Sequence, residues 1–166
     1  KVKHTKGFGA DVILFGATLN EGYERARQIA DQHGMTLVHP SDDPKIVAAT
    51  GTIGLELLAD APEIETIVVP VGGGGLIAGI ATAAKALHRR IRIVGVQTKA
   101  YPAMAYALQG RKAKPPSGGI ATLADGIAVK APGTLNRAIV RRLVKEVLLV
   151  ADDSIETAIQ MLANDE

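Results

Sequence analysis

The chain has 166 residues, with 19 Lys and Arg against 17 Asp and Glu, a formal net charge of +2, and no Cys. Without Cys it has no disulfide framework, no thiolate nucleophile and no Cys-based zinc site. The small net charge and the 3% aromatic content argue against nucleic-acid binding. No apolar run reaches the roughly 18 residues of a membrane span, and no signal peptide is recognised. We therefore expect a protein of the cytoplasm.

Short apolar runs alternate with longer helical patterns, which is typical of an α/β fold. The apolar run at residues 12–15 predicts a strand. A helix follows and ends before Gly34, which stands where a C′ glycine belongs. Residues 36–39 predict a second short strand. Together these segments predict a βαβ unit near the beginning of the chain.

A second helix is predicted to begin after two acidic residues. Asp42 and Asp43 precede Pro44, and a capping carboxylate followed by Pro is a common helix start. Capping is therefore favoured over an acid–base pair for these carboxylates. The same helix contains Gly51 and Gly54, which predict close approach of its backbone to a neighbouring element or to a ligand.

The alternation continues through the rest of the chain. Strands are predicted at residues 67–71, 92–96 and 147–150, helices at 76–87, at 134–145 and from 153 onward, and a loop at 110–120. The continuous apolar run of the first of these strands is typical of a buried strand. The predicted fold class is α/β, with an open, mostly parallel sheet and helices on both faces.

Four consecutive glycines, Gly72, Gly73, Gly74 and Gly75, lead from the strand at residues 67–71 into the next helix. No Cβ blocks an approaching anion there, and the helix N-terminus adds unpaired N–H groups and the positive end of its dipole. The glycines therefore predict a phosphate cradle. A turn that merely allows close packing of helix and strand remains the alternative interpretation.

Two nucleotide-binding motifs fit this loop less well. A P-loop would place Lys and then Ser or Thr after the glycines, and Leu76 follows them instead. Gly73, Gly75 and Ala78 match a dinucleotide-binding pattern, but the next strand ends at Gln97 and lacks the acid that would hold a ribose. The loop thus fits a single phosphate monoester better than a dinucleotide.

Three segments, in order, resemble the threonine dehydratases, which are pyridoxal-phosphate enzymes of fold type II related to serine racemases and serine dehydratases. Residues 68–79, VVPVGGGGLIAG, resemble the family's tetraglycine loop. Residues 39–44 and 51–56 are similar to its HPFDDP…GQGTIGLEI segment, and residues 122–130 to its TIADGIAVK segment. The resemblance covers essentially the whole chain.

The resemblance implies a lyase that uses pyridoxal 5′-phosphate to convert L-threonine, or serine in related enzymes, to a 2-oxo acid and ammonia; for threonine the product is 2-oxobutyrate. The four glycines would bind the cofactor phosphate through their backbone amides. Gly126 would lie near the cofactor ring, with its carbonyl as the contact. The resemblance also implies amino-acid metabolism, including isoleucine biosynthesis. We further expect a homo-oligomer with an amino acid as its small-molecule partner, and no nucleic-acid or membrane partner.

Parts of the family pattern have no counterpart in this sequence: the Schiff-base Lys, the Ser/Asn loop that holds the substrate, and the C-terminal Gly-rich segment. No catalytic residue is therefore assigned, and the isolated chain is expected to be inactive. Residues 1–40 would be the end of the small domain and residues 41–166 part of the large cofactor-binding domain, so the sheet is expected to be incomplete. Its unpaired apolar edges predict self-association.

No metal site is predicted. The four His residues show no ligand spacing, and Gln97 stands where the serine racemase branch has an acidic metal ligand. Two functions other than threonine dehydratase stay open. One is a sister enzyme of fold type II, such as serine racemase. The other is a non-catalytic phosphate-binding module that uses the loop without chemistry.

Overall fold

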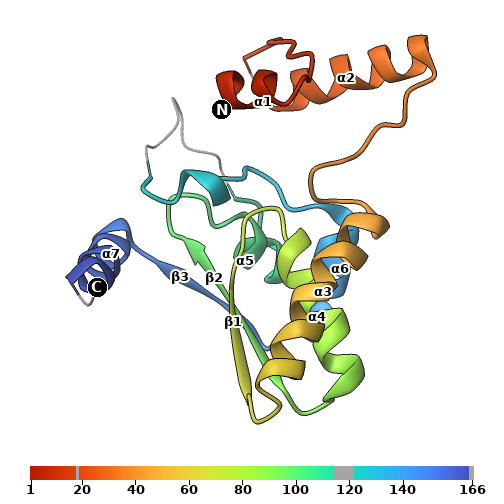
Figure 1. Cartoon of the computed structure of the whole chain (residues 1–166). Helices are drawn as coiled ribbons and strands as arrows, with labels where there is room; N and C mark the ends of the chain where they lie inside the picture. Colours follow the sequence, from red (N-terminus) through yellow and green to blue (C-terminus); the bar gives the residue numbers. More distant parts are fainter. Residues whose placement is uncertain (18, 114–121, 165–166) are drawn as a thin grey trace. The chain divides into compact units, whose positions relative to one another are not determined.

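The computed structural model describes residues 1–17, 19–113 and 122–164, and the chain divides into two compact units, Lys1–Val38 and His39–Glu166 (Figure 1). The first unit contains α1 (Val2–Gly7) and α2 (Leu19–His33). The second contains α3 (Pro44–Asp60), β1 (Thr66–Pro70), α4 (Gly75–Leu87), β2 (Arg92–Thr98), α5 (Ala103–Leu108), the 3₁₀ helix η1 (Asp125–Ile127), α6 (Thr134–Leu143), β3 (Glu146–Val150) and α7 (Asp152–Asn164). Their assignment to a small and a large domain stays a prediction.

In the first unit the predicted helix is present as α2, and it ends where it was predicted to end. Gly34 follows α2 with φ of +63°, the left-handed conformation expected of a C′ glycine. The N–H of Met35 donates to the carbonyl of Ala30 at 2.8 Å, which satisfies one of the carbonyls in the last turn. The end of α2 is therefore set by local sequence.

The two strands predicted beside this helix are wrong. Residues 12–15 and 36–39 have no regular secondary structure, and Ile13, Leu14 and Phe15 are exposed. An apolar run forms a strand only where a neighbouring strand satisfies its backbone N–H and C=O groups. No segment described in this unit offers such a ladder. The βαβ unit is therefore not formed here.

In the second unit β1, β2 and β3 form a parallel sheet in that order. Ile67 pairs with Ile93, and Gly95 pairs with Val147. The predicted class, an open parallel α/β sheet, is confirmed. The loop predicted at residues 110–120 falls on 110–113, which have no helix or strand, and on 114–120, which lie outside the described residues.

Strand β1, predicted as a buried strand from its continuous apolar run, is covered on one face by the described part of the chain. Val69 is 1% exposed and Val68 is 62% exposed, so successive side chains alternate between core and surface. The described helices that pack on β1 lie on the side of Val69. The predicted burial is thus seen on the face of β1 that the described helices cover.

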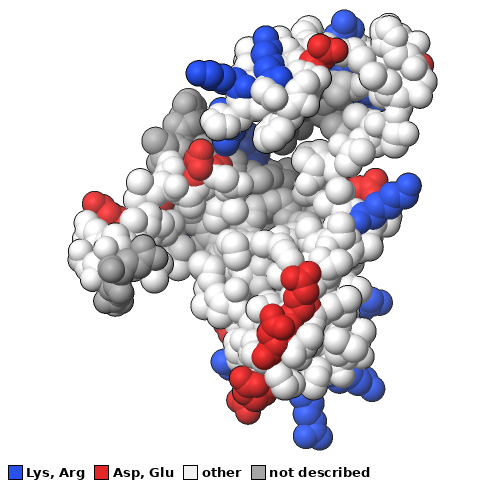
Figure 2. Space-filling view, in the orientation of Figure 1, with Lys and Arg blue, Asp and Glu red and all other residues white. Residues whose placement is uncertain are grey.

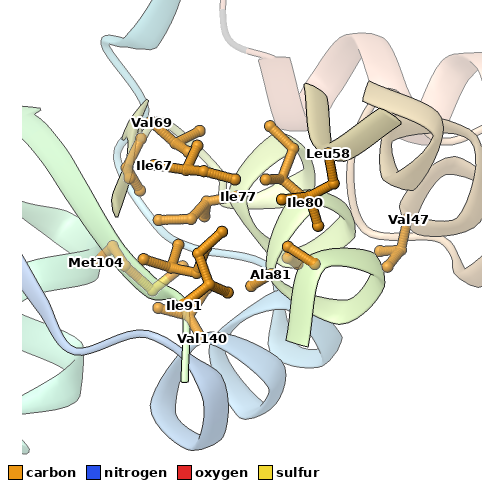
Figure 3. Packing of buried hydrophobic residues seen from close by; sticks show 14 residues of the cluster. Val47, Leu58, Ile67, Val69, Ile77, Ile80, Ala81, Ile91, Met104 and Val140 are labelled. Carbon is orange, nitrogen blue, oxygen red and sulfur yellow. The ribbon is translucent and has the colours of Figure 1, made fainter. Parts of the chain in front are cut away.

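The core lies between this face of the sheet and α3, α4, α5 and α6 (Figure 3). Ile77, Ile80 and Ala81 of α4 lie at its centre, with Met104 of α5 and Val140 of α6 beside them. Burial of each large aliphatic side chain contributes roughly 1.5–3 kcal/mol. Since α4 supplies most of the central side chains, its position relative to the sheet is firmly fixed.

Glycines bring α3 and α4 into close contact. A Cβ built on Gly54 would lie 3.0 Å from the carbonyl oxygen of Ile80. A Cβ on Gly79 would overlap the Thr50 hydroxyl and the Val47 carbonyl oxygen. The close approach predicted from the glycines of α3 is therefore to a neighbouring helix. It fixes α4, and with it the loop that precedes α4, against α3.

Charged side chains are spread over the surface of the larger unit. On the face shown in Figure 2, acidic and basic groups are separated by stretches of uncharged surface. Among the residues that the structure describes, no helix has the length and apolar character needed to cross a membrane.

Candidate functional site

The four glycines connect the carboxyl end of β1 to the first turn of α4. Val71 is the last residue held by the sheet, because its N–H donates to the carbonyl of Val96 at 2.8 Å. Gly74 is the residue that precedes α4 and has φ of +95° and ψ of 1°. Only glycine adopts this conformation readily. The sharp turn therefore requires glycine at this position, because a residue with a side chain would be strained in this conformation.

The amides of this loop are unpaired. Within the described part of the chain, the N–H groups of Gly72, Gly73, Gly74 and Gly75 donate to no acceptor. Gly74 and Gly75 are nevertheless buried. Buried N–H groups almost always have a partner, so a run without one calls for an acceptor from outside the described residues. A phosphate dianion at the N-terminus of α4 provides such acceptors.

The missing side chains of the loop leave space that neighbouring residues fill. A Cβ on Gly75 would lie 2.8 Å from the carbonyl oxygen of Ser41, and one on Gly73 would lie 3.0 Å from its hydroxyl. A Cβ on Gly74 would lie 2.5 Å from the terminal methyl of Met104. The glycines thus serve close packing, the alternative that the sequence left open. The same residues also carry the unpaired amides.

The two consecutive acidic residues cap two different helices. Asp43 accepts a hydrogen bond from the N–H of Lys45 at 2.7 Å, as predicted for the start of α3. Asp42 reaches α6, where it accepts from the N–H of Thr134 at 2.8 Å and from that of Asn136 at 3.1 Å. Capping of the helix that begins at Pro44 is confirmed for Asp43, whereas Asp42 accepts from a helix whose first residue, Thr134, lies 92 residues further along the chain.

His39 shapes the turn that presents these carboxylates. Its Nδ1 accepts hydrogen bonds from the N–H of Ser41 at 3.0 Å and from that of Asp42 at 2.6 Å. In both bonds the ring nitrogen Nδ1 is the acceptor. The histidine therefore acts on the backbone. The described residues contain no group of three or more His, Asp and Glu suited to a metal ion.

Two buried amide side chains contact the loop, and sequence reasoning missed the role of both. Gln97 and Asn136 are each 0% exposed. Gln97 donates to the carbonyl of Val71 at 3.1 Å, and Asn136 donates to the carbonyl of Gly73 at 3.2 Å. Asn136 lies four residues before Val140, on the core-facing side of α6. A polar residue at such a position was the available signal.

The segment predicted to lie near the cofactor ring adjoins the first glycine of the loop. A Cβ on Gly72 would lie 3.1 Å from Ile127 Cα and 3.1 Å from a methyl carbon of Val129. Gly126 itself is exposed within η1, and a Cβ placed on it would meet no atom within 4 Å. The structure therefore brings the segment of Gly126 to the loop. The role of its carbonyl stays a prediction.

A parallel sheet whose first strand leads into a packed helix through glycine amides without a partner among the described residues defines an α/β protein with a loop of the geometry that can accept an anion. The family is shown by comparison: the chain belongs to the pyridoxal-phosphate-dependent enzymes, whose family model matches residues 1–166. The geometry of the loop is compatible with this family, because the family's cofactor carries a phosphate monoester. The predicted resemblance, fold type and cofactor class are confirmed.

Among the relatives is an L-threonine ammonia-lyase of Geobacter sulfurreducens, 48% identical over 163 residues, which are 98% of this chain and 40% of that protein. The solved structure of processed threonine deaminase isoform 2 from Solanum lycopersicum is 33% identical, with a TM-score of 0.87, and the match covers 98% of this chain and 47% of that one. Maize serine racemase is 35% identical, with a TM-score of 0.87, over 96% of this chain and 50% of that one. The chain thus spans about half the length of these relatives.

Proposed function

We propose that this chain is the part of a pyridoxal-phosphate-dependent threonine ammonia-lyase that holds the cofactor phosphate. The observation that carries the proposal is the run of amides at Gly72–Gly75, which have no acceptor among the described residues and lead into the first turn of α4. Similarity to threonine ammonia-lyases at 44–48% identity supports the choice within the family. When bound, the cofactor supplies the electron sink for conversion of L-threonine to 2-oxobutyrate and ammonia.

The chain's own contribution is binding and orientation. The four glycine amides would donate hydrogen bonds to the phosphate oxygens, and the positive end of the α4 dipole would favour the dianion. The carbonyl of Gly126 would contact the ring from the segment that lies against Gly72. The descriptions of the relatives support amino-acid metabolism. A cytoplasmic homo-oligomer in isoleucine biosynthesis is the finer form of the same proposal.

The phosphate site is tested by titrating the chain with inorganic phosphate and with pyridoxal phosphate, followed by ³¹P and ¹H–¹⁵N NMR. We expect saturable binding of both, with the largest amide shifts at the four loop glycines. Chloride at matched ionic strength serves as the control and should leave these signals in place. The absence of saturable binding at millimolar phosphate, with the chain folded, contradicts the proposal.

Turnover by the chain alone is a separate test. None of its lysines stands in the family's lysine motif, so the covalent route used by these enzymes lacks its nucleophile. When the chain is incubated with threonine and cofactor, we expect 2-oxobutyrate to form no faster than it does with free pyridoxal phosphate alone. A robust rate of 2-oxobutyrate formation, linear in protein concentration, would show that a lysine of this chain serves instead.

Serine racemase is the second candidate, because maize serine racemase matches this chain with a TM-score of 0.87. The two activities differ in their products from one substrate, since dehydration of L-serine gives pyruvate and racemisation gives D-serine. An assay of the complete natural protein with L-serine and L-threonine, measuring both oxo acids and D-serine, separates them. We expect 2-oxobutyrate from threonine to dominate.

A further inference from the structure

Each carbonyl of the glycine loop is held by the protein. The carbonyl of Gly74 accepts from the N–H of Ala78 at 3.0 Å, the first helical bond of α4. The carbonyl of Gly75 lies 3.1 Å from the Thr50 hydroxyl, which also approaches two carbonyls of its own helix. Amide side chains donate to the carbonyls of Val71, Gly72 and Gly73, and the carbonyl of Gly73 also accepts from a backbone N–H.

Holding a carbonyl also aims an amide. No peptide bond of the described chain is cis, and in a trans peptide the N–H of the next residue points opposite to the C=O. A hydrogen bond that draws the carbonyl of Val71 into the protein therefore turns the N–H of Gly72 away from it. In the same way, a bond to the carbonyl of Gly73 directs the N–H of Gly74.

Gln97 fixes the first of these peptides from the end of β2. Its Nε2 donates to the carbonyl of Val71 at 3.1 Å and lies 3.5 Å from that of Gly72. Its Oε1 accepts from the N–H groups of Met104 and Ala105, both at 3.1 Å, at the first turn of α5. Because both ends of this buried amide are held, its rotation is blocked. The carbonyl of Val71 thereby has one fixed direction.

Asn136 fixes the second peptide from α6. Its Nδ2 donates to the carbonyls of Gly73 at 3.2 Å and Ser41 at 2.9 Å. The N–H of Gly133 adds a second bond to the Gly73 carbonyl at 3.1 Å. The backbone of Asn136 is itself held by Asp42. Asn136 Oδ1 is buried and has no partner in the described residues, so the side chain's ordered contacts are the two carbonyls.

We infer that Gln97 and Asn136 are positioning residues that hold two loop peptides by their carbonyls and so direct the amides of Gly72 and Gly74 at the bound phosphate dianion. The inference rests on the proposed function, because it takes the phosphate site as given. It assigns the two side chains no contact with the ligand. They act through the orientation of the backbone.

The test compares Gln97→Met and Asn136→Leu, which keep approximate side-chain size and remove the donors without adding charge. We expect the Kd for pyridoxal phosphate to rise about tenfold in each, since misaligned hydrogen bonds to a charged group lose at least that much affinity. The Kd for pyridoxal, which lacks the phosphate, should stay within twofold. Gln109→Met, at the exposed end of α5, is the matched control and should change neither.

The outcomes separate the inference from the proposed function. Failure of the unaltered chain to bind phosphate overturns both. Binding that is the same in the unaltered chain and in both variants overturns the inference alone. An equal loss of affinity for pyridoxal and for pyridoxal phosphate also overturns it, because a general structural defect would weaken the binding of both ligands.

A second measurement needs no variant and stands if either variant fails to fold. On titration of the unaltered chain with inorganic phosphate, we expect the ¹H–¹⁵N signals of Gly72 and Gly74 to shift downfield and their amide exchange to slow. Phosphate binding that leaves both of these amides unchanged overturns the inference.

Discussion

At the residue scale, one carboxylate connects two distant parts of the sequence. Asp42 accepts hydrogen bonds from two amides at the start of α6, and the side chain of Asn136 returns to the loop at Gly73. An N-cap normally stabilises only its own helix. Here it also holds the residue that fixes the loop, so its removal should affect both stability and phosphate binding.

Asp42→Ala should lower the free energy of unfolding by about 1–2 kcal/mol, since two helix N–H groups lose their acceptor. Asp43→Ala, which removes the cap of α3 alone, should cost about 1 kcal/mol and leave phosphate affinity unchanged. Urea unfolding followed by circular dichroism measures the first effect, and phosphate titration the second. Equal phosphate affinity in the two variants would contradict the coupling that we describe.

Two glycines of the predicted site offer a matched pair. Gly74→Ala forces a left-handed conformation on a residue with a Cβ, at about 1–2 kcal/mol, and adds a contact with Met104. Gly126→Ala places its methyl in open space and should change the free energy of unfolding by less than about 0.5 kcal/mol. Thermal unfolding compares the two.

Because Gly126→Ala leaves the fold intact, it can report on the ligand. A methyl group at this position would occupy space in which the cofactor ring is expected. We therefore expect weaker binding of pyridoxal phosphate together with unchanged binding of inorganic phosphate. Unchanged affinity for both would remove Gly126 from the predicted site.

At the scale of elements, the sequence predicted what depends on local chemistry. Asp43 and Pro44 marked the start of α3, and Gly34 marked the end of α2. The glycines correctly located the junction of β1 and α4. The short helix α5 was not predicted, because its six residues follow Pro102 without a side-chain cap. Local signals were thus sufficient where the stabilising partner lies within a few residues.

Features that depend on distant partners could not be derived in this way. The runs at residues 12–15 and 36–39 have the composition of strands, yet strand formation requires a neighbouring ladder. The sequence showed that Gln97 lacks a carboxylate. Its hydrogen bond to the carbonyl of Val71 could not be predicted, because it depends on the pairing of β1 with β2. In the sequence Asn136 is one polar residue of a predicted helix, and its contact with the loop depends on how α6 packs.

Contact between α3 and α4 gives a prediction at this scale. Gly79→Ala should lower the free energy of unfolding by about 1–3 kcal/mol, because the methyl meets backbone atoms of α3 that can move only with the helix. This loss outweighs the gain of up to about 1 kcal/mol in helix propensity. Thr82→Ala, on the exposed side of the same helix, is the control and should be neutral. Greater stability in Gly79→Ala would contradict the close packing.

At the scale of the whole molecule, both units expose large apolar side chains. In the first unit, Leu14 is 78% exposed and Phe15 56% exposed. In the second, Val68 of β1 and Leu148 of β3 are 62% and 47% exposed. Exposed apolar side chains of this size can favour association in water when they lie together. These residues are therefore the ones at which we test the predicted self-association.

We expect light scattering to show a mass above 17.3 kDa that rises with protein concentration. Val68→Thr keeps a β-branched side chain and makes it polar, so it should shift the association to higher concentration without loss of secondary structure. The same substitution at Val69, which is buried, should unfold the second unit instead. A monodisperse monomer at high concentration would contradict this prediction.

The hydrogen bonds from α6 to Asp42 determine when, during synthesis of the chain, the glycine loop can become fixed. On the ribosome, β1, the glycine loop and α4 emerge well before Gly133 and Asn136. The carbonyl of Gly73 gains its anchors only when this later stretch has been synthesised and has folded back. Pyridoxal phosphate bound by the nascent chain before that point would therefore dissociate quickly. Slow dissociation of the cofactor would begin only once α6 has packed against the loop.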